Sequence, residues 1–125
     1  MAGGAGCGQG TAKVAQKSAR VTVNSDTLTT HDVSCAQVQW LLTMDIRANP
    51  ANVRAVLQLD LDQPKSQSIN IENFNGFSGV ADAAVGKAEA TFSGGAYHIT
   101  GTVHRTNPEN PAEPENAAFS IDATC

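Results

Sequence analysis

The sequence predicts an all-β domain, an antiparallel β-sandwich or partly open barrel of about six to eight strands with at most one short helix. Apolar and polar residues alternate in short segments that Asn, Pro, Gly and Asp separate. Only 16% of the 125 residues are charged, and Thr, Ser, Val and Asn are abundant, which is typical of β-rich secreted domains. The length suits a single domain with its own core.

The chain is predicted to divide at residue 18. Residues 1–18 are Gly, Ala, Lys, Gln and Ser without a usable period, which favours a flexible tether. Residues 19–125 are expected to form the single β domain. It opens with Val21 and Val23 on one strand face, and Asn24-Ser25-Asp26 is a turn signal.

Residues 33–46 are expected to form one long strand with a bulge. Val33 and Cys35 share one parity. The opposite parity is shared by Val38, Trp40, Leu42, Met44 and Ile46. Because strand side chains alternate strictly, the change of parity predicts a bulge or bend near Ala36.

Residues 51–62 fit two secondary structures. Asn49 as a cap with Pro50 at the first position would suit a helix. The strand face would consist of Val53, Ala55, Leu57, Leu59 and Leu61. Five alternating matches favour the strand.

Two hairpins follow. One turns at Asn75-Gly76, a strong turn pair, and the other, within residues 87–104, turns at Ser93-Gly94-Gly95. Gly101 falls on an inward position of the second hairpin, which predicts close approach by another backbone or ring. Three prolines place residues 106–116 in a loop.

The last strand ends in a cysteine with core-facing parity. Phe119, Ile121, Ala123 and Cys125 share one face of this strand. Cys35 also faces inward, so the two cysteines suit a disulfide, although two buried thiols that merely pack are the alternative. A disulfide would imply an oxidising compartment.

Cys7 follows the small residues Gly4, Ala5 and Gly6. A lone thiol in a flexible segment is either modified or incidental. The run is similar to the end of a bacterial lipobox, in which small residues precede a cysteine that is diacylated, although an aliphatic residue is usual where Gly4 stands. In that interpretation residues 1–6 are a signal-peptide remnant, and acyl chains on Cys7 anchor the chain to a membrane.

The C-terminal third carries a family resemblance. "GGAYHITGTVHRTNPENPAEPENAAFSIDATC" is similar to the pattern Tyr-x-Ile-Thr-Gly-Thr, a Pro/Asn-rich loop and a strand ending in Cys. With "NFNG" at 73–76 and "VSCAQVQ" at 33–39, the chain resembles the mycobacterial LpqH lipoprotein antigen family. The resemblance covers residues 19–125.

This resemblance implies a non-enzymatic, extracytoplasmic lipoprotein of the cell envelope, acylated on Cys7 and bridged between Cys35 and Cys125. It also implies an antigen whose acylated end is sensed by host Toll-like receptors, which are pattern-recognition receptors. The family's best-known member has a Thr-rich, O-glycosylated tether, whereas only Thr11 and Ser18 are available here.

No catalytic, metal or cofactor site is predicted. His98 and His104 would lie about 20 Å apart along one strand, too far to share a metal. Asp60 and Asp62 could form a carboxylate pair, but a strand-end turn is the plainer interpretation. The net charge of −4 and the scattered basic residues argue against nucleic-acid binding.

Three residues raise a second functional hypothesis, an apolar cleft that binds or carries an envelope lipid. Leu41 and Val56 have outward parity on strongly apolar strands, and Gly101 points inward. The ordinary alternative is a central strand that a neighbouring segment, residues 77–85, covers.

Overall fold

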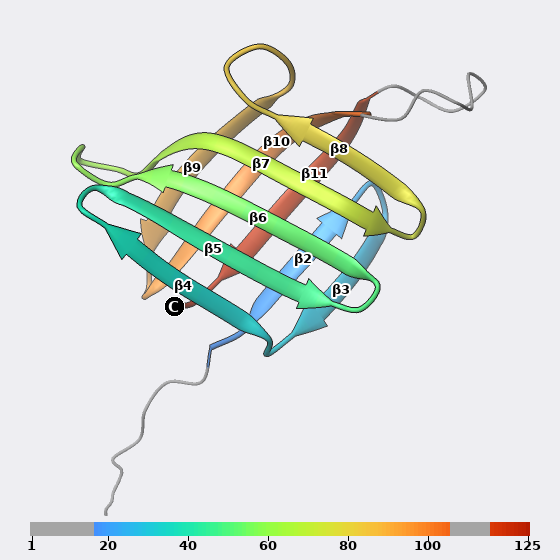
Figure 1. The fold of residues 1–125 in the computed structure, drawn as a ribbon, viewed down its shortest axis with the longest axis horizontal. Helices are drawn as coiled ribbons and strands as arrows, with labels where there is room; N and C mark the ends of the chain where they lie inside the picture. Colours follow the sequence, from blue (N-terminus) through green and yellow to red (C-terminus); the bar gives the residue numbers. More distant parts are fainter. Residues whose placement is uncertain (1–16, 106–115) are drawn as a thin grey trace, which may run out of the picture.

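The computed structural model describes residues 17–105 and 116–125, which form ten strands in one sheet (Figure 1). The strands are β2 (Ala19–Val23), β3 (Asp26–Thr30), β4 (Val33–Val38), β5 (Leu41–Ala48), β6 (Ala51–Gln58), β7 (Lys65–Phe74), β8 (Phe77–Ala81), β9 (Lys87–Ser93), β10 (Ala96–Arg105) and β11 (Asn116–Ala123). Their order is β3-β2-β11-β10-β8-β7-β6-β5-β4, and β9 pairs with β10. No helix in the described part of the chain has the length and apolarity to traverse a bilayer.

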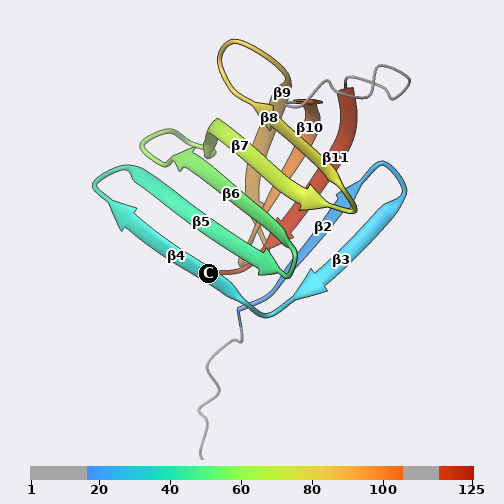
Figure 2. The same ribbon diagram turned by 45° about the vertical axis from the view of Figure 1, so that its right-hand side comes forward.

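The sheet folds onto itself in two layers. Strands β4 to β8 lie in one layer and cross the strands of the other, β2, β3, β9, β10 and β11 (Figures 1 and 2). The two layers meet where β8 pairs with β10 over only two residue pairs, Val80 with His104 and Gly79 with Arg105. This antiparallel arrangement confirms the predicted sandwich or partly open barrel, with ten strands in place of six to eight.

The expected long strand with a bulge near Ala36 is wrong. The chain instead forms a hairpin, in which Val38 pairs with Leu41 across a turn of Gln39 and Trp40. Gln39 adopts a left-handed φ of 54°. The hairpin explains the change of parity, because Val38 and Trp40 leave the inward face and are exposed.

The ambiguous segment after Pro50 is a strand, as the alternation predicted. It ends at Gln58, earlier than the sequence pattern. Leu59 packs partly against the core, whereas Leu61 is exposed in the loop between β6 and β7. Asp60 and Asp62 therefore lie in this loop and not on a strand.

Both predicted hairpin turns are present. Asn75 and Gly76 have φ values of 51° and 83°, as a two-residue turn between antiparallel strands requires. Gly94 and Gly95 turn the chain between β9 and β10 with φ values of 61° and 80°. Residues 106–115, where the Pro-rich loop was predicted, lie outside the described residues.

The core lies between the two layers and contains no polar or charged side chain among the described residues. Its largest fully buried side chains are Phe74, Met44, Ile46, Leu57, Ile69, Ile71, Ile99 and Ile121. Both layers contribute, so the packing of one layer on the other removes the apolar faces of both from water.

Replacement of Gly101 by Ala is expected to destabilise the domain by about 1–3 kcal/mol. A Cβ atom at this position would collide with the carbonyl oxygen of Lys87 and approach Ala88 Cα to 2.9 Å, both backbone atoms of the paired strand. Urea unfolding measures the effect. The control is Thr100→Ala at the exposed neighbouring position, which should change the free energy of unfolding by less than about 0.5 kcal/mol. Equal stability of both variants would contradict this close approach.

Candidate functional site

A disulfide joins the two layers at one end of the domain. Cys35 on β4 is bonded to Cys125, with 5.8 Å between the Cα atoms and a sequence separation of 90. β4 is an outermost strand of the sheet, and Cys125 follows the end of β11. In the chain-entropy description, closing a loop of this length contributes roughly 4–5 kcal/mol.

The N-terminal segment enters the domain beside this disulfide. Ser18 N donates to Thr124 Oγ1, and Thr124 N donates to Ser18 O, each at 2.9 Å. His31 Nδ1 lies 3.1 Å from Lys17 O. The entry point is thus fixed to the residue that precedes Cys125. We call this side of the molecule the tether end; Cys7 itself lies outside the described residues.

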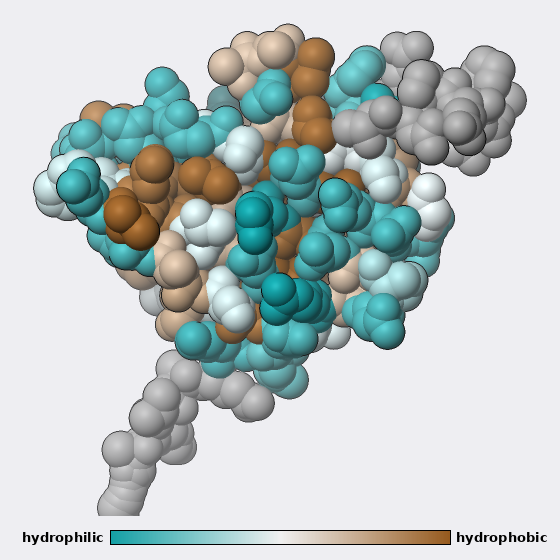
Figure 3. Space-filling view, in the orientation of Figure 1, coloured by the Kyte–Doolittle hydropathy of each residue, from teal (hydrophilic) through white to brown (hydrophobic). Residues whose placement is uncertain are grey.

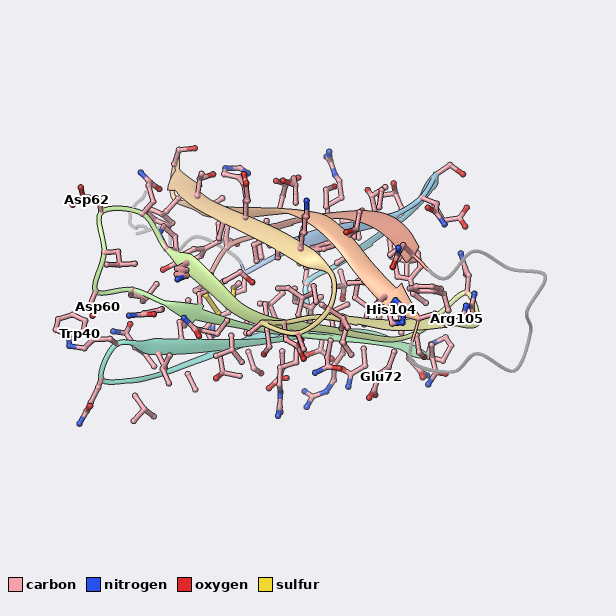
Figure 4. The ribbon with its side chains drawn as sticks, turned by 90° about the horizontal axis from the view of Figure 1, so that it is seen from above. Trp40, Asp60, Asp62, Glu72, His104 and Arg105 are labelled. Atoms are coloured by element: carbon pink, nitrogen blue, oxygen red, sulfur yellow. A yellow bond between two sulfur atoms is a disulfide. The ribbon has the colours of Figure 1, made fainter. Side chains whose placement is uncertain are left out.

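Three turns lie along the side of the molecule that adjoins the chain entry, although Lys17 itself meets the β3–β4 connection at the other end of β4. One cross-strand row runs from Ala19 through Ala123 and Tyr97 to Phe92. Phe92 N donates to Gln63 Oε1 at 3.0 Å, which links the β9–β10 hairpin to the β6–β7 loop. A second backbone bond links that loop to the β4–β5 turn, from Leu59 N to Trp40 O at 2.8 Å. Figure 4 shows Trp40, Asp60 and Asp62 together at this end, with Glu72, His104 and Arg105 toward the other.

The tether end concentrates exposed apolar side chains. Six large apolar side chains are exposed in the described ranges 17–105 and 116–125, and five of them lie on these three turns or on the strand residues that flank them. The five are Val38 (73% exposed), Trp40 (60%), Leu61 (53%), Leu41 (46%) and Phe92 (45%). We call these five residues the apolar tip. Figure 3, in the orientation of Figure 1, shows hydrophobic side chains gathered on the left of the β4–β8 layer, where β4, β5 and β6 approach their turns.

The structure does not bring Leu41, Val56 and Gly101 into one cleft. Leu41 and Val56 lie on the outer face of the β4–β8 layer, whereas Gly101 lies on β10 against the backbone of β9. Residues 77–81 form strand β8 beside β7, so the expected cover over Leu41 and Val56 is wrong. Leu41 belongs to the apolar tip, and Val56 is half-buried between its strand neighbours Thr43 and Ser68.

The pocket enclosed by the core is small. It is apolar, lined by core residues such as Val21, Leu28 and Phe74, and has a volume of about 10 Å³, far below the several hundred cubic ångströms of typical ligand sites. Larger hollows open at the surface. One of about 280 Å³ lies at the far end between the two layers, lined by polar and apolar residues alike, and there the Arg105 guanidinium lies 4.9 Å from the centre of the Phe77 ring.

A polar hollow, of about 330 Å³, lies on the outer face of β5, β6 and β7. Arg54 Nε donates to Asp45 Oδ1 at 2.8 Å within it. This ion pair raises the pKa of Arg54, first through the hydrogen bond and then through the charge of Asp45. The pair keeps the guanidinium charged and oriented along the sheet.

The histidines each have a separate partner. His98 Nδ1 donates to Asp122 Oδ1 at 2.6 Å, and His104 Nδ1 lies 3.1 Å from Asn116 Oδ1. The bond to Asp122, followed by the one to the Ser93 carbonyl, raises the pKa of His98. No cluster of three or more His, Cys, Asp or Glu side chains suited to a metal occurs among the residues that the structure describes.

The carboxylates of the β6–β7 loop form no acid–base pair with a histidine in the described part of the chain. Asp60 Oδ1 accepts a hydrogen bond from Gln58 Nε2 at 2.6 Å, and Gln58 Oε1 in turn accepts one from Gln67 at 2.7 Å. These bonds fix the end of β6 against β7. Their role is therefore to close the strand pair.

Comparisons with known proteins place the chain among mycobacterial lipoproteins. A family described as Mycobacterium 19 kDa lipoprotein antigen matches residues 12–125. A putative lipoprotein of Mycobacterium indicus pranii is 34% identical over 108 residues, which cover 86% of this chain and 78% of that protein. The probable lipoprotein LppE of Mycobacterium tuberculosis is 33% identical over 125 residues, covering 99% and 89%. Lipoprotein LpqH of Mycobacterium bovis is 32% identical over 98 residues, covering 77% and 61%.

The fold and the bridge define a class, a disulfide-linked all-β domain whose N-terminal segment enters beside the bridge. Within it, the chain belongs to the Mycobacterium 19 kDa lipoprotein antigen family. The predicted resemblance to the LpqH family is confirmed. Lipoproteins of this kind are membrane-anchored proteins of the cell envelope.

Removal of the bridge with Cys35→Ala and Cys125→Ala together is expected to lower the free energy of unfolding by about 2–5 kcal/mol. Urea unfolding measures this loss, and amide exchange at Ser18 and Thr124 should accelerate because their mutual hydrogen bonds adjoin Cys125. Cys7→Ala is the matched control and should leave both quantities unchanged. A double variant as stable as the parent would refute a structural role for the bridge.

Replacement of Asp122 by Asn is expected to lower the pKa of His98, because the carboxylate hydrogen bond is the largest cause of its rise. A raised folded-state pKa stabilises the fold below the unfolded value, near 6.5, and this contribution disappears as pH rises through the folded value. NMR titration of the His98 ring measures the shift, with His104 as the internal reference. An unchanged His98 titration in the variant would count against the bond.

Proposed function

We propose that the chain is a non-catalytic, surface-displayed lipoprotein antigen of the mycobacterial cell envelope, anchored by acyl chains on Cys7. The observation that carries the proposal is family membership over residues 12–125, joined to a cysteine after Gly4-Ala5-Gly6. Two or three acyl chains would hold the chain stably, whereas a single chain gives only marginal binding.

The described residues support a structural role for the titratable groups. Hydrogen bonds join His98 to Asp122, Arg54 to Asp45, and Asp60 to Gln58. Asp82 accepts hydrogen bonds from the backbone of Ala84 and Val85, which lower its pKa and fix the loop after β8. Each of these groups thus has a partner that orders a turn or a strand pair.

Recognition by the host follows from the same anchor. Acyl chains on Cys7 would be the part that a Toll-like receptor senses, and the β domain would be the part that antibodies recognise. The disulfide supports this display, because it keeps the domain folded in an oxidising compartment.

A lipid carrier is the alternative function, and the packed interior counts against it. An acyl chain needs a far larger space than the apolar pocket of about 10 Å³ that the described core encloses.

Acylation of Cys7 is tested by mass spectrometry of the protein from native envelopes. The N-terminal peptide should begin at Cys7 and carry two or three acyl chains. Cys7→Ala should release the protein into the soluble fraction and abolish signalling through the receptor in a reporter cell. The Cys35→Ala, Cys125→Ala variant is the control, since it should still be acylated. An unmodified Cys7 in envelope material would overturn the anchor.

A further inference from the structure

We propose that the apolar tip is a second lipid contact, which docks the β domain on the surface of the bilayer that anchors the chain. The proposal rests on the lipid anchor of the proposed function. It assigns to the tip one occupant, a bilayer surface of neutral or zwitterionic headgroups, and it fixes which end of the domain faces the membrane.

The distribution of exposed apolar side chains carries the first step. Five of the six large ones in the described residues lie at the tether end, and Val85 on the β8–β9 loop is the sixth. Clustered exposure of this kind marks an interaction surface, whereas single exposed apolar residues are ordinary. The tip is also held in place, because Trp40 O accepts from Leu59 N and Phe92 N donates to Gln63.

The entry point of the chain carries the second step. Ten residues separate Cys7 from Lys17, so even a fully extended segment spans at most about 35 Å. Ser18, where this segment joins the domain, is bonded to Thr124 beside the disulfide, and β4 runs from Cys35 to Val38 in three residues, about 10 Å. The anchor therefore presents the tip to the lipid at high effective concentration.

The chemistry of the tip selects the kind of surface. Trp and Phe combine a large apolar ring with a preference for the boundary between lipid and water. Asp60 and Asp62 lie on the same side of the molecule as Trp40, with Asp62 displaced toward the other layer (Figure 4), and the chain carries a net charge of −4. Anionic headgroups would repel these carboxylates, so binding should weaken when anionic lipid is added and should not depend on attraction between opposite charges.

The same carboxylates argue against a second copy of the chain as the occupant. Two tips packed face to face would bring Asp60 and Asp62 of both copies together in a site with little water. Like charges in such a site are destabilising. A bilayer surface lets the rings enter while the carboxylates remain in the headgroup layer.

The full chain provides its own probe for a direct test. Trp40 is the single tryptophan, and Cys7 is the single cysteine outside the bridge. Cys7 is coupled to a maleimide lipid in phosphatidylcholine vesicles, and Trp40 emission is recorded with and without acrylamide. Emission should move to shorter wavelength on coupling, and quenching should fall about twofold.

Two variants, each with changes only at exposed positions, distinguish docking through the apolar tip from an effect of added negative charge anywhere on the surface. Val38→Asp with Leu61→Asp should abolish the shift and the protection, whereas Val85→Asp, the sixth exposed apolar residue, should keep both. Far-UV circular dichroism confirms that each variant is folded.

Identical emission on and off the vesicle would overturn the proposal, as would equal losses in the Val85→Asp control. A concentration-dependent shift without vesicles would assign the tip to self-association and also overturn it. Because the coupling is chemical, the result is independent of acylation in the cell. An unmodified Cys7 in native envelopes would thus refute the proposed anchor without deciding the docking test.

Discussion

The Cys35–Cys125 bond joins two layers whose shared sheet is continuous only at the short pairing of β8 with β10. The two layers are continuous through only two residue pairs between β8 and β10, so the opposite side needs its own fastening. There, Thr30 Oγ1 donates to Arg47 O at 2.8 Å, Arg47 N donates to Asp32 O at 3.0 Å, and the disulfide ties β4 to the end of β11. The bridge thus ties Cys125, which is itself exposed, to the half-buried Cys35 at the edge of the core.

Closure at this point also organises the surface. The segment that leads to Cys7 enters through hydrogen bonds to Thr124, one residue before the bridge. The β4–β5 turn lies a few residues beyond the other half of the bridge. The bridge therefore joins the strand that leads to Trp40 to the residue that follows the chain-entry contact at Thr124.

The alternation of apolar and polar residues and the residue types at the turns explain how much of the fold could be predicted from the sequence. Asn75-Gly76 and Gly94-Gly95 mark their hairpins because glycine accepts a positive φ without cost. Gln39 and Trp40 carry no such signal, so the sequence pattern predicts one strand where the β4–β5 hairpin stands. Alternation also runs on through Leu59 and Leu61, past the end of β6, and only the bonds of Gln58 to Asp60 and Gln67 show where pairing stops.

The apolar tip escaped prediction for a physical reason that bears on its role. Parity assigned Val38 and Trp40 to the core, since a strand pattern cannot distinguish a residue that packs inward from one that a turn projects outward. Their exposure brings no packing energy to the fold, and the core beneath them is complete without them. Apolar side chains that folding does not need are kept at a cost in solubility, so their exposure agrees with the proposed contact between the tip and a bilayer surface.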